Sequence, residues 1–568
     1  MTTRSVPRGA ALGLPSARLL SGCGAGNDES ESSTSSSAQT PDTSPAELNV
    51  SVTDVPGSDQ QVQRITVTSD EADSSPSPYD LAFQSDVNGT LEELQDTEHS
   101  TPEQPLMVLN PFGTNTTGLY VRFATEGEGT FDYTITSDGH ETFSRTAKNH
   151  ATEPDVFESQ LIGLVAGTEN TLTTTWRPDE GDPVENTVKI SEPRSQAGYT
   201  NQLERDVQGD PEQLADGMFL LSGSYQAGPY GFLFDNHGTL RAELPIESHM
   251  LDRFERYEDT LIYPVGDHTL ARVDGLGRVV NSYDLGRYEM HHDFELTENG
   301  QALILVSDTS RDSIEDILIS LDLATGEYEE VIDFADLLKG YKDLTNSYEA
   351  PDSDGVIVDD WLHLNSVDFN DAEDSVIVSG RENSTIIKVG SVHGDPVVDY
   401  LIGQDELWEG SGLEDALLTK DGDFSDTGGQ HAVFRMEDDS LEDGQQLLSI
   451  FDNSYWRILS REDYNGPVPE DATEVSGSDQ GEDSHVRTYL VDENEGTYSQ
   501  VDGFDVPYSS IVSSAQRVGD NTVVNSGQAF VLSEHDENNN VIATYSYDGE
   551  NYSYRGMKYS FDDFWYES

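Results

Sequence analysis

Between residues 105 and 193, short apolar runs alternate with turn residues. Runs at residues 106–109, 118–123 and 131–135 are rich in β-branched and aromatic side chains and are separated by Gly, Asn and Asp. Two further runs follow at residues 161–164 and 172–176. This density of strands is typical of a small β-sandwich, which we place at residues 101–195.

From residue 196 onward, pairs of apolar runs recur around tight turns that contain Asp, Asn or Gly. Gly and Asn supply the positive φ that such hairpins need. Neither a helical period nor a strict blade signature is present in this part of the sequence. The length fits about five to eight four-stranded blades, and we expect six. The predicted fold class is therefore all-β, with a six-bladed β-propeller at residues 196–568 preceded by the small β-sandwich.

Residues 24–100 have a different composition, dominated by Ser, Thr, Asp, Glu and Pro. Such a segment cannot bury enough apolar surface to offset the entropy lost on ordering. We therefore predict a disordered acidic stalk, with a short strand near residues 61–67 as its one ordered part.

Residues 1–23 resemble a signal peptide that ends in a lipobox, Leu-Ser-Gly-Cys at residues 20–23. Cleavage there would leave Cys23 as the acylated first residue, although a chance tetrapeptide is the alternative. Cys23 is also the only cysteine, so a disulfide framework and a thiolate metal site are both excluded. We expect an extracytoplasmic protein, either a cell-surface lipoprotein or secreted, that meets the membrane only through this anchor.

The chain carries 109 Asp and Glu against 30 Lys and Arg, a formal net charge of −79. Such self-repulsion opposes a compact state at low salt, whereas a Debye length of about 3 Å in 1 M salt removes most of it. The 25 Tyr, 20 Phe and 5 Trp argue against a disordered acidic chain. We expect a halophilic protein that binds neither nucleic acid nor an anionic membrane surface.

Three histidine motifs stand immediately before predicted strand pairs in the propeller region. They contain His291 with His292, His363, and His431. The innermost strands of a propeller line its channel, so these side chains can converge although they are far apart in sequence. Each histidine also has a structural interpretation, as a hydrogen-bonded strand residue, and a metal-binding one, since imidazole is a common zinc ligand. Acidic runs such as residues 437–439 are interpreted as surface composition.

Five sequence blocks occur in a fixed order around these histidines. They are His-His-Asp-Phe at residues 291–294, Trp-Leu-His-Leu-Asn-Ser-Val-Asp at 361–368, Ser-Gly-Arg at 379–381, Gln-His at 430–431 and Phe-Asp-Asn at 451–453. In this order they resemble the blocks of the bacterial aryl-sulfate sulfotransferases, which also have a β-sandwich before a six-bladed propeller. Asn-Pro at residues 110–111 and Tyr-Arg at 554–555 resemble further blocks of that family, so that the similarity covers about residues 105–565.

The resemblance implies transfer of a sulfuryl group from a phenolic sulfate ester to a phenol, independent of a nucleotide sulfate donor. In that family a histidine takes up the sulfuryl group covalently, and His431 occupies the matching position. His363, Asn365 and Arg381 match the residues that hold the sulfate. The implied partners are a phenolic sulfate donor and a phenol acceptor, and we expect no cofactor and no metal.

The chemistry of these side chains agrees with that implication. A neutral imidazole is a good nucleophile near neutral pH, and a covalent intermediate divides one difficult displacement into two. Because donor and acceptor are both phenols, one histidine can act as acid in one half-reaction and as base in the other. Either His291 or His292 matches this proton-transfer position, and the sequence does not decide which. Arg381 would stabilise charge on the sulfuryl oxygens.

The sequence departs from the family in one respect. Some members carry a disulfide near the active site, which a chain with one cysteine cannot form. Two other functions stay open at this point: a surface-anchored propeller that binds a partner without catalysis, and a metallo-hydrolase. The oligomeric state is also open, with a homodimer as one option.

Overall fold

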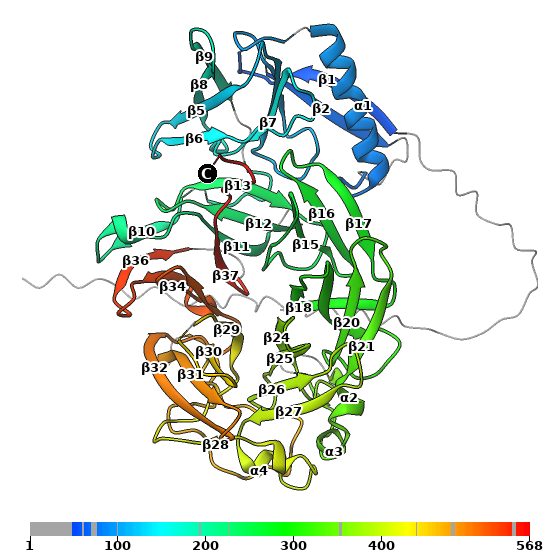
Figure 1. Ribbon diagram of the computed structural model, residues 1–568, viewed down its shortest axis with the longest axis vertical. Coiled ribbons are helices and arrows are strands. Elements are labelled where there is room, and N and C mark those ends of the chain that lie inside the picture. Colours follow the sequence, from blue (N-terminus) through cyan, green and yellow to red (C-terminus); the bar gives the residue numbers. More distant parts are fainter. Residues whose placement is uncertain are drawn as a thin grey trace, which may run out of the picture.

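The computed structural model describes residues 48–59, 62–69, 76–98, 100–191, 195–200, 202–225, 228–350, 355–438, 440–478, 483–547 and 552–567. It shows an N-terminal β-sandwich next to a larger ring of sheets (Figure 1). The predicted lipobox with Cys23, and the predicted stalk up to residue 47, lie outside the described residues. Within them, no helix combines the length and apolar character that crossing a bilayer requires.

The sandwich consists of two sheets that share an apolar interior. The first has the strand order β1 (Leu48–Asp54), β2 (Val62–Ser69), β3 (Leu106–Leu109), β4 (Leu119–Ala124) and β7 (Val156–Leu161). The second has the order β6 (Phe143–Ala147), β5 (Gly129–Ser137), β8 (Glu169–Pro178) and β9 (Val184–Ser191). Buried residues alternate along β5 and β8, because one face of each strand covers the core. Phe123 and Phe157 stack in that core with ring centroids 5.0 Å apart.

Part of the predicted stalk is folded, so the stalk prediction is wrong for residues 48–98 within the described ranges. The short strand expected near residues 61–67 is β2, which pairs in parallel with β3. The helix α1 (Leu81–Glu98) lies beside β1 and β2 (Figure 1). Phe83, Val87 and Leu91 are four residues apart on one face of α1, and all three are buried. The predicted stalk is polar on average, so its composition does not reveal this single apolar stripe.

In the part of the chain that the structure describes, six sheets form the blades of the propeller, as predicted, and the four main strands of each blade are antiparallel. Blade 1 contains β37 (Gly556–Tyr559), β11 (Met218–Tyr225), β12 (Gly228–Phe234) and β13 (Leu240–Pro245). Blade 2 contains β14 (Glu255–Tyr257), β15 (Thr260–Gly266), β16 (Thr269–Asp274) and β17 (Val279–Asp284). Blade 3 contains β18 (Tyr288–Leu296), β19 (Gln301–Asp308), β20 (Ile317–Asp322) and β21 (Tyr328–Asp333).

The remaining blades follow in chain order. Blade 4 contains β24 (Leu364–Asn370), β25 (Ser375–Gly380), β26 (Thr385–Gly390) and β27 (Val397–Ile402). Blade 5 contains β29 (His431–Met436), β30 (Gln445–Asp452), β31 (Asp483–Asp492) and β32 (Thr497–Pro507), with β28 (Thr419–Lys420) on its outer edge. Blade 6 contains β33 (Ser514–Val518), β34 (Asn521–Ser526), β35 (Val531–His535) and β36 (Val541–Ser546). The connections contain β22 (Tyr348–Glu349), β23 (Ile357–Val358), α2 (Phe334–Leu337), α3 (Lys339–Lys342), α4 (Asp405–Trp408), η1 (Pro211–Gln213), η2 (Glu414–Ala416) and η3 (Gly527–Ala529).

Segments from both ends of the propeller sequence close the ring. Strand β10 (Glu204–Val207) precedes blade 1 in the chain but pairs with β36 at the outer edge of blade 6. Strand β37 follows blade 6 in the chain but pairs with β11 in blade 1. The chain then reaches the sandwich, where the amide of Lys148 donates to the carbonyl of Trp565 at 3.0 Å. The C-terminus accordingly lies between the two domains (Figure 1).

Candidate active site

Strand order places the predicted site residues at one face of the ring. In an antiparallel blade, the entrance to the innermost strand and the turn from the second to the third strand lie at the same edge. His363 immediately precedes β24, His431 begins β29, and His291 and His292 lie within β18. Arg381 lies in the turn between β25 and β26, the second and third strands of blade 4.

The entrances to these three innermost strands are irregular. The register with the second strand shifts between Met290 and Phe294 in blade 3, and comparable shifts occur at the start of β24 and β29. His292, His363 and Ala432 have positive φ values of 58°, 52° and 50°. Residues other than glycine rarely adopt this conformation, and such strain is concentrated at functional sites. The bulges redirect the histidine side chains out of the regular strand pattern.

The three histidine motifs converge around Tyr554. The ring of His292 lies 5.1 Å from that of His291 and 5.3 Å from that of His363, measured between centroids. Tyr554 stacks on His292 with a centroid distance of 4.7 Å and an interplanar angle of 11°. The same tyrosine meets His431 edge-on at 5.9 Å. Tyr554 therefore joins the His431 motif to the other two.

His431 is held in one tautomer by its surroundings. Its Nδ1 lies 2.7 Å from Oδ1 of Asn453 and 3.0 Å from the carbonyl oxygen of Gly429. Asn453 donates through Nδ2 to the carbonyls of Ser509 and Val512 at 2.7 and 2.9 Å, so its Oδ1 must be the acceptor. The proton is therefore on Nδ1 and the lone pair on Nε2. Burial, together with the charge of Arg381, holds the pKa of His431 well below its usual value.

His363 has the opposite electrostatic environment. Its Nδ1 lies 2.7 Å from Oδ2 of Asp360 and 2.8 Å from Oε2 of Glu315. Burial alone would lower the pKa of His363, but the two carboxylates raise it to about 10. Burial would also raise the pKa of Glu315, yet the neighbouring histidines hold it well below its usual value. The result is a histidine cation beside the neutral His431.

Arg381 and Asn365 lie close to these two histidines. The backbone amide of Arg381 donates to the carbonyl of His363 at 3.1 Å, and its guanidinium lies 3.8 Å from the carboxylate of Glu382. Asn365 is fully buried and donates through Nδ2 to the carbonyl of Gln430 at 2.8 Å. Asn365 therefore fixes the backbone next to His431.

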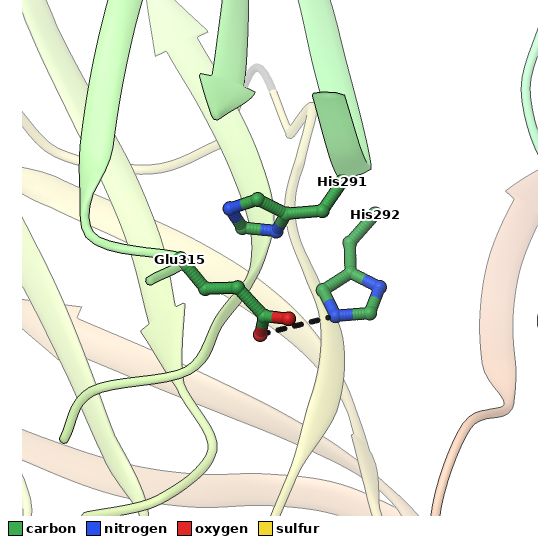
Figure 2. A group of neighbouring side chains, drawn as sticks. All are labelled: His291, His292 and Glu315. Carbon is green, nitrogen blue, oxygen red and sulfur yellow. Dashed lines mark ion pairs between the residues drawn. The ribbon is translucent and has the colours of Figure 1, made fainter. Parts of the chain in front are cut away.

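His291, His292 and Glu315 form a compact group at the start of blade 3. Figure 2 shows both imidazole rings near the carboxylate of Glu315, with Nε2 of His292 3.4 Å from Oε2. His291 is buried, and neither of its ring nitrogens has a hydrogen-bond partner among the described residues. Burial lowers the pKa of His291 to about 3. A ligand atom from each of the three residues lies within 4.8 Å of the others, so that the group could hold a metal ion.

A buried ion-pair network around Asp293 lies next to the histidines and stabilises the strands that carry them. Asp293 accepts from Nη1 of Arg555 at 2.7 Å and lies 3.1 Å from Nη1 of Arg253. The other oxygen of Asp293 accepts from the amide of Val367 at 2.9 Å, and Arg555 donates to the carbonyl of Asn365 at 2.8 Å. These contacts connect β18, β24 and the residue that follows Tyr554.

Four residues of this site were not singled out from the sequence, namely Glu315, Asp360, Asn453 and Tyr554. Glu315 follows β19 in blade 3 and Asn453 follows β30 in blade 5. Each therefore lies in the turn between the second and third strands of its blade, as Arg381 does in blade 4. Their position in this turn is a feature of the sequence from which both residues could have been predicted to lie at the site. Asn453 and Tyr554 belonged to the recognised blocks without a role, whereas no sequence feature distinguished Asp360 from the other acidic residues.

The arrangement offers a neutral imidazole nucleophile, two cationic side chains beside it and an aromatic ring. These features suit the attack of a nitrogen nucleophile on an anionic group attached to an aromatic oxygen. A family model described as arylsulfotransferase (ASST) matches residues 204–561, more than half of the chain. The chain belongs to the arylsulfotransferase family. A second model, the arylsulfotransferase Ig-like domain, matches residues 106–193 and coincides with the sandwich. As a member of this family, the protein is a sulfotransferase that acts on phenolic substrates.

Comparisons with other proteins add little to the family assignment. No curated protein matches the chain. Among solved structures, the WD40 domain of Toxoplasma gondii coronin is 9% identical, with 61% of this chain and 75% of that one covered and a TM-score of 0.30. A putative 6-phosphogluconolactonase from Bacteroides fragilis is 11% identical, with 77% and 99% covered and a TM-score of 0.33. At such TM-scores these similarities carry no argument about function.

Proposed function

We propose that this enzyme moves a sulfuryl group from a phenolic sulfate ester to a phenol through a sulfohistidine at Nε2 of His431, without a nucleotide sulfate donor. The observation that supports this most directly is the tautomer of His431. Asn453 and Gly429 accept from Nδ1, so the lone pair is on Nε2. The depressed pKa keeps the ring neutral and nucleophilic.

The cationic side chains next to His431 suit the sulfuryl group in transit. Charge on its oxygens grows or shifts during the displacement, and fixed donors in a water-poor site stabilise that charge. His363 is held as a donor by Asp360 and Glu315, and the guanidinium of Arg381 lies close enough to affect His431. Asn365 contributes by fixing the strand that carries His431.

The proposed transfer consists of two half-reactions. Nε2 of His431 attacks sulfur, the bond from sulfur to the phenolic oxygen breaks, and the leaving oxygen takes a proton from His292. The adduct keeps its Nδ1 proton, so the ring is an N-sulfonated imidazolium and a good leaving group. The acceptor phenol then returns a proton to His292 and attacks sulfur, and the electron pair of the N–S bond returns to Nε2. Among the paired histidines we assign this proton transfer to His292, because its ring contacts that of His363 and stacks on Tyr554, which in turn contacts His431.

Intact-mass measurement in molar salt tests this proposal. Protein treated with 4-nitrophenyl sulfate should gain one sulfuryl group and lose it when phenol is added. His431→Asn should keep the fold, form no adduct and show no transfer. His393→Asn is the matched control, because His393 pairs with Asp374 away from the site. Full turnover by His431→Asn would contradict the proposed nucleophile.

The predicted export and lipid anchor remain part of this proposal. They rest on the lipobox at residues 20–23, and we expect the mature chain to begin with an acylated Cys23. The strongly acidic composition supports a setting of high salt.

A further inference from the structure

We propose that His291, His292 and Glu315 form a binding site for a divalent transition-metal ion such as Zn²⁺, and that the bound ion inhibits sulfuryl transfer. The proposed metal site is inferred from geometry and does not depend on the proposed function. The inhibition rests on the proposed function, because it depends on the proton-transfer role of His292.

The distances in this group suit metal ligation better than hydrogen bonding. Nε2 of His292 and Oε2 of Glu315 are 3.4 Å apart, beyond the usual range of a hydrogen bond. Ligands at about 2.0–2.1 Å from a tetrahedral zinc ion are separated by about 3.3 Å. One ligand atom of His291 also lies within 4.8 Å of both others, so that small side-chain rotations complete the set.

His291 supplies an independent indication of a ligand. Its side chain is only 9% exposed, and neither ring nitrogen has a hydrogen-bond partner among the described residues. An unpaired polar group in such a position carries a desolvation cost. Figure 2 shows the ring next to the carboxylate of Glu315 and close to His292. A metal ion between these residues would satisfy a ring nitrogen that the protein leaves unpaired.

The ligand set also selects the class of metal. Two imidazoles and one carboxylate suit Zn²⁺ and its neighbours in the first transition row, whereas Mg²⁺ and Ca²⁺ prefer oxygen ligands throughout. A second group, Glu315 with Asp360 and His363, is less suitable, because Nδ1 of His363 is already hydrogen-bonded to Asp360 at 2.7 Å. Oε2 of Glu315 also lies 2.8 Å from Nδ1 of His363. Because a carboxylate oxygen has two lone pairs, Oε2 can keep this contact with His363 while it binds the ion.

Binding at this position would block the proposed reaction. The lone pair of Nε2 of His292 cannot serve a metal ion and a phenolic proton at the same time. Because His292 stacks on Tyr554, the ion would also lie at the wall of the site that faces His431.

A cobalt titration of the full chain tests the metal site directly. Chelator-treated protein in molar KCl should bind one equivalent of Co²⁺ with the intense visible bands of four- or five-coordinate cobalt, and Zn²⁺ should displace it. Surface carboxylates would give only weak octahedral bands. His291→Phe, which keeps ring volume without donors, and Glu315→Gln should both lose these bands. His393→Phe, a change at an exposed histidine paired with Asp374, should retain them.

Transfer assays on the same samples test the inhibition. Zn²⁺ should suppress transfer by the wild type over the concentration range in which it displaces cobalt, and a chelator should restore it. Absence of the intense bands from folded wild type, or their persistence in both site variants, would overturn the metal site. Stoichiometric binding without loss of transfer would overturn the inhibition. If the wild type showed no transfer at all, the proposed function would fail while the cobalt titration still decided the metal site.

Discussion

Asn453 accepts a hydrogen bond from Nδ1 of His431 at 2.7 Å, and its own amide is held by two backbone carbonyls. The asparagine cannot rotate to present its NH₂ group without losing both of those bonds. The tautomer of His431 is thus determined by the backbone of the segment that leads into blade 6.

Asn453→Ala should therefore lower kcat by about 10- to 100-fold, by analogy with the loss seen when a residue that orients a metal-ligating histidine is removed. The KM for the aryl sulfate should change much less, because Asn453 is fully buried and its side chain is bonded to His431, Ser509 and Val512. Steady-state kinetics with 4-nitrophenyl sulfate would measure both constants. Asn521→Ala is a suitable control, since Asn521 is also buried in the propeller but bonds to Gln213 and Glu534. An unchanged kcat would contradict the orienting role.

Tyr554 should act through its ring and not through its hydroxyl group. The hydroxyl has no hydrogen-bond partner among the described residues, and burial holds its pKa well above the usual value. Tyr554→Phe should stay within about threefold of the wild type in kcat/KM, whereas Tyr554→Ala should lose about fivefold or more, because stacking is worth about 1 kcal/mol or more. Equal losses in both variants would show that the hydroxyl takes part in the chemistry.

Glu382 should make stability depend on pH. Burial, opposed by the charge of Arg381, raises the pKa of this carboxyl from 4.5 to about 7. Between these values the folded state binds more protons than the unfolded state, so this contribution to stability is lost as the pH rises through 7. Glu382→Gln should therefore exceed the wild type in unfolding free energy at pH 8 by roughly 3 kcal/mol, and by less at pH 5. Denaturant unfolding at both pH values, with the exposed Glu462→Gln as control, measures this; equal differences at the two pH values would rule it out.

Salt should stabilise the fold through screening. With a net charge of −79, repulsion between acidic side chains is the main opposing term that salt can remove. The thermal midpoint should rise steeply between 0.2 and 3 M KCl, values chosen to span Debye lengths from roughly 7 Å to below 3 Å. Sucrose, which stabilises compact states without screening, should not replace KCl. Equal stabilisation by both solutes would argue against the electrostatic explanation.

The sequence predicted those features that depend on strand order alone. His291, His363 and His431 could be placed together because the innermost strands of a propeller share one channel. Asp360 could not, since nothing distinguishes it among 109 acidic residues until the loop that carries it is placed in space. The helix α1 was missed for a related reason: Phe83, Val87 and Leu91 are a small apolar minority in a polar segment.

The ring closure through β37 has a consequence for when the enzyme becomes active. Tyr554 and Arg555 immediately precede this strand, and β37 is the last strand of the propeller to be synthesised. The pairing that completes blade 1 therefore also brings in the aromatic ring between His292 and His431 and the guanidinium that neutralises Asp293. A chain interrupted after blade 6 would possess every proposed reacting histidine and still lack an assembled site. Competence for chemistry is in this way coupled to the synthesis and pairing of β37.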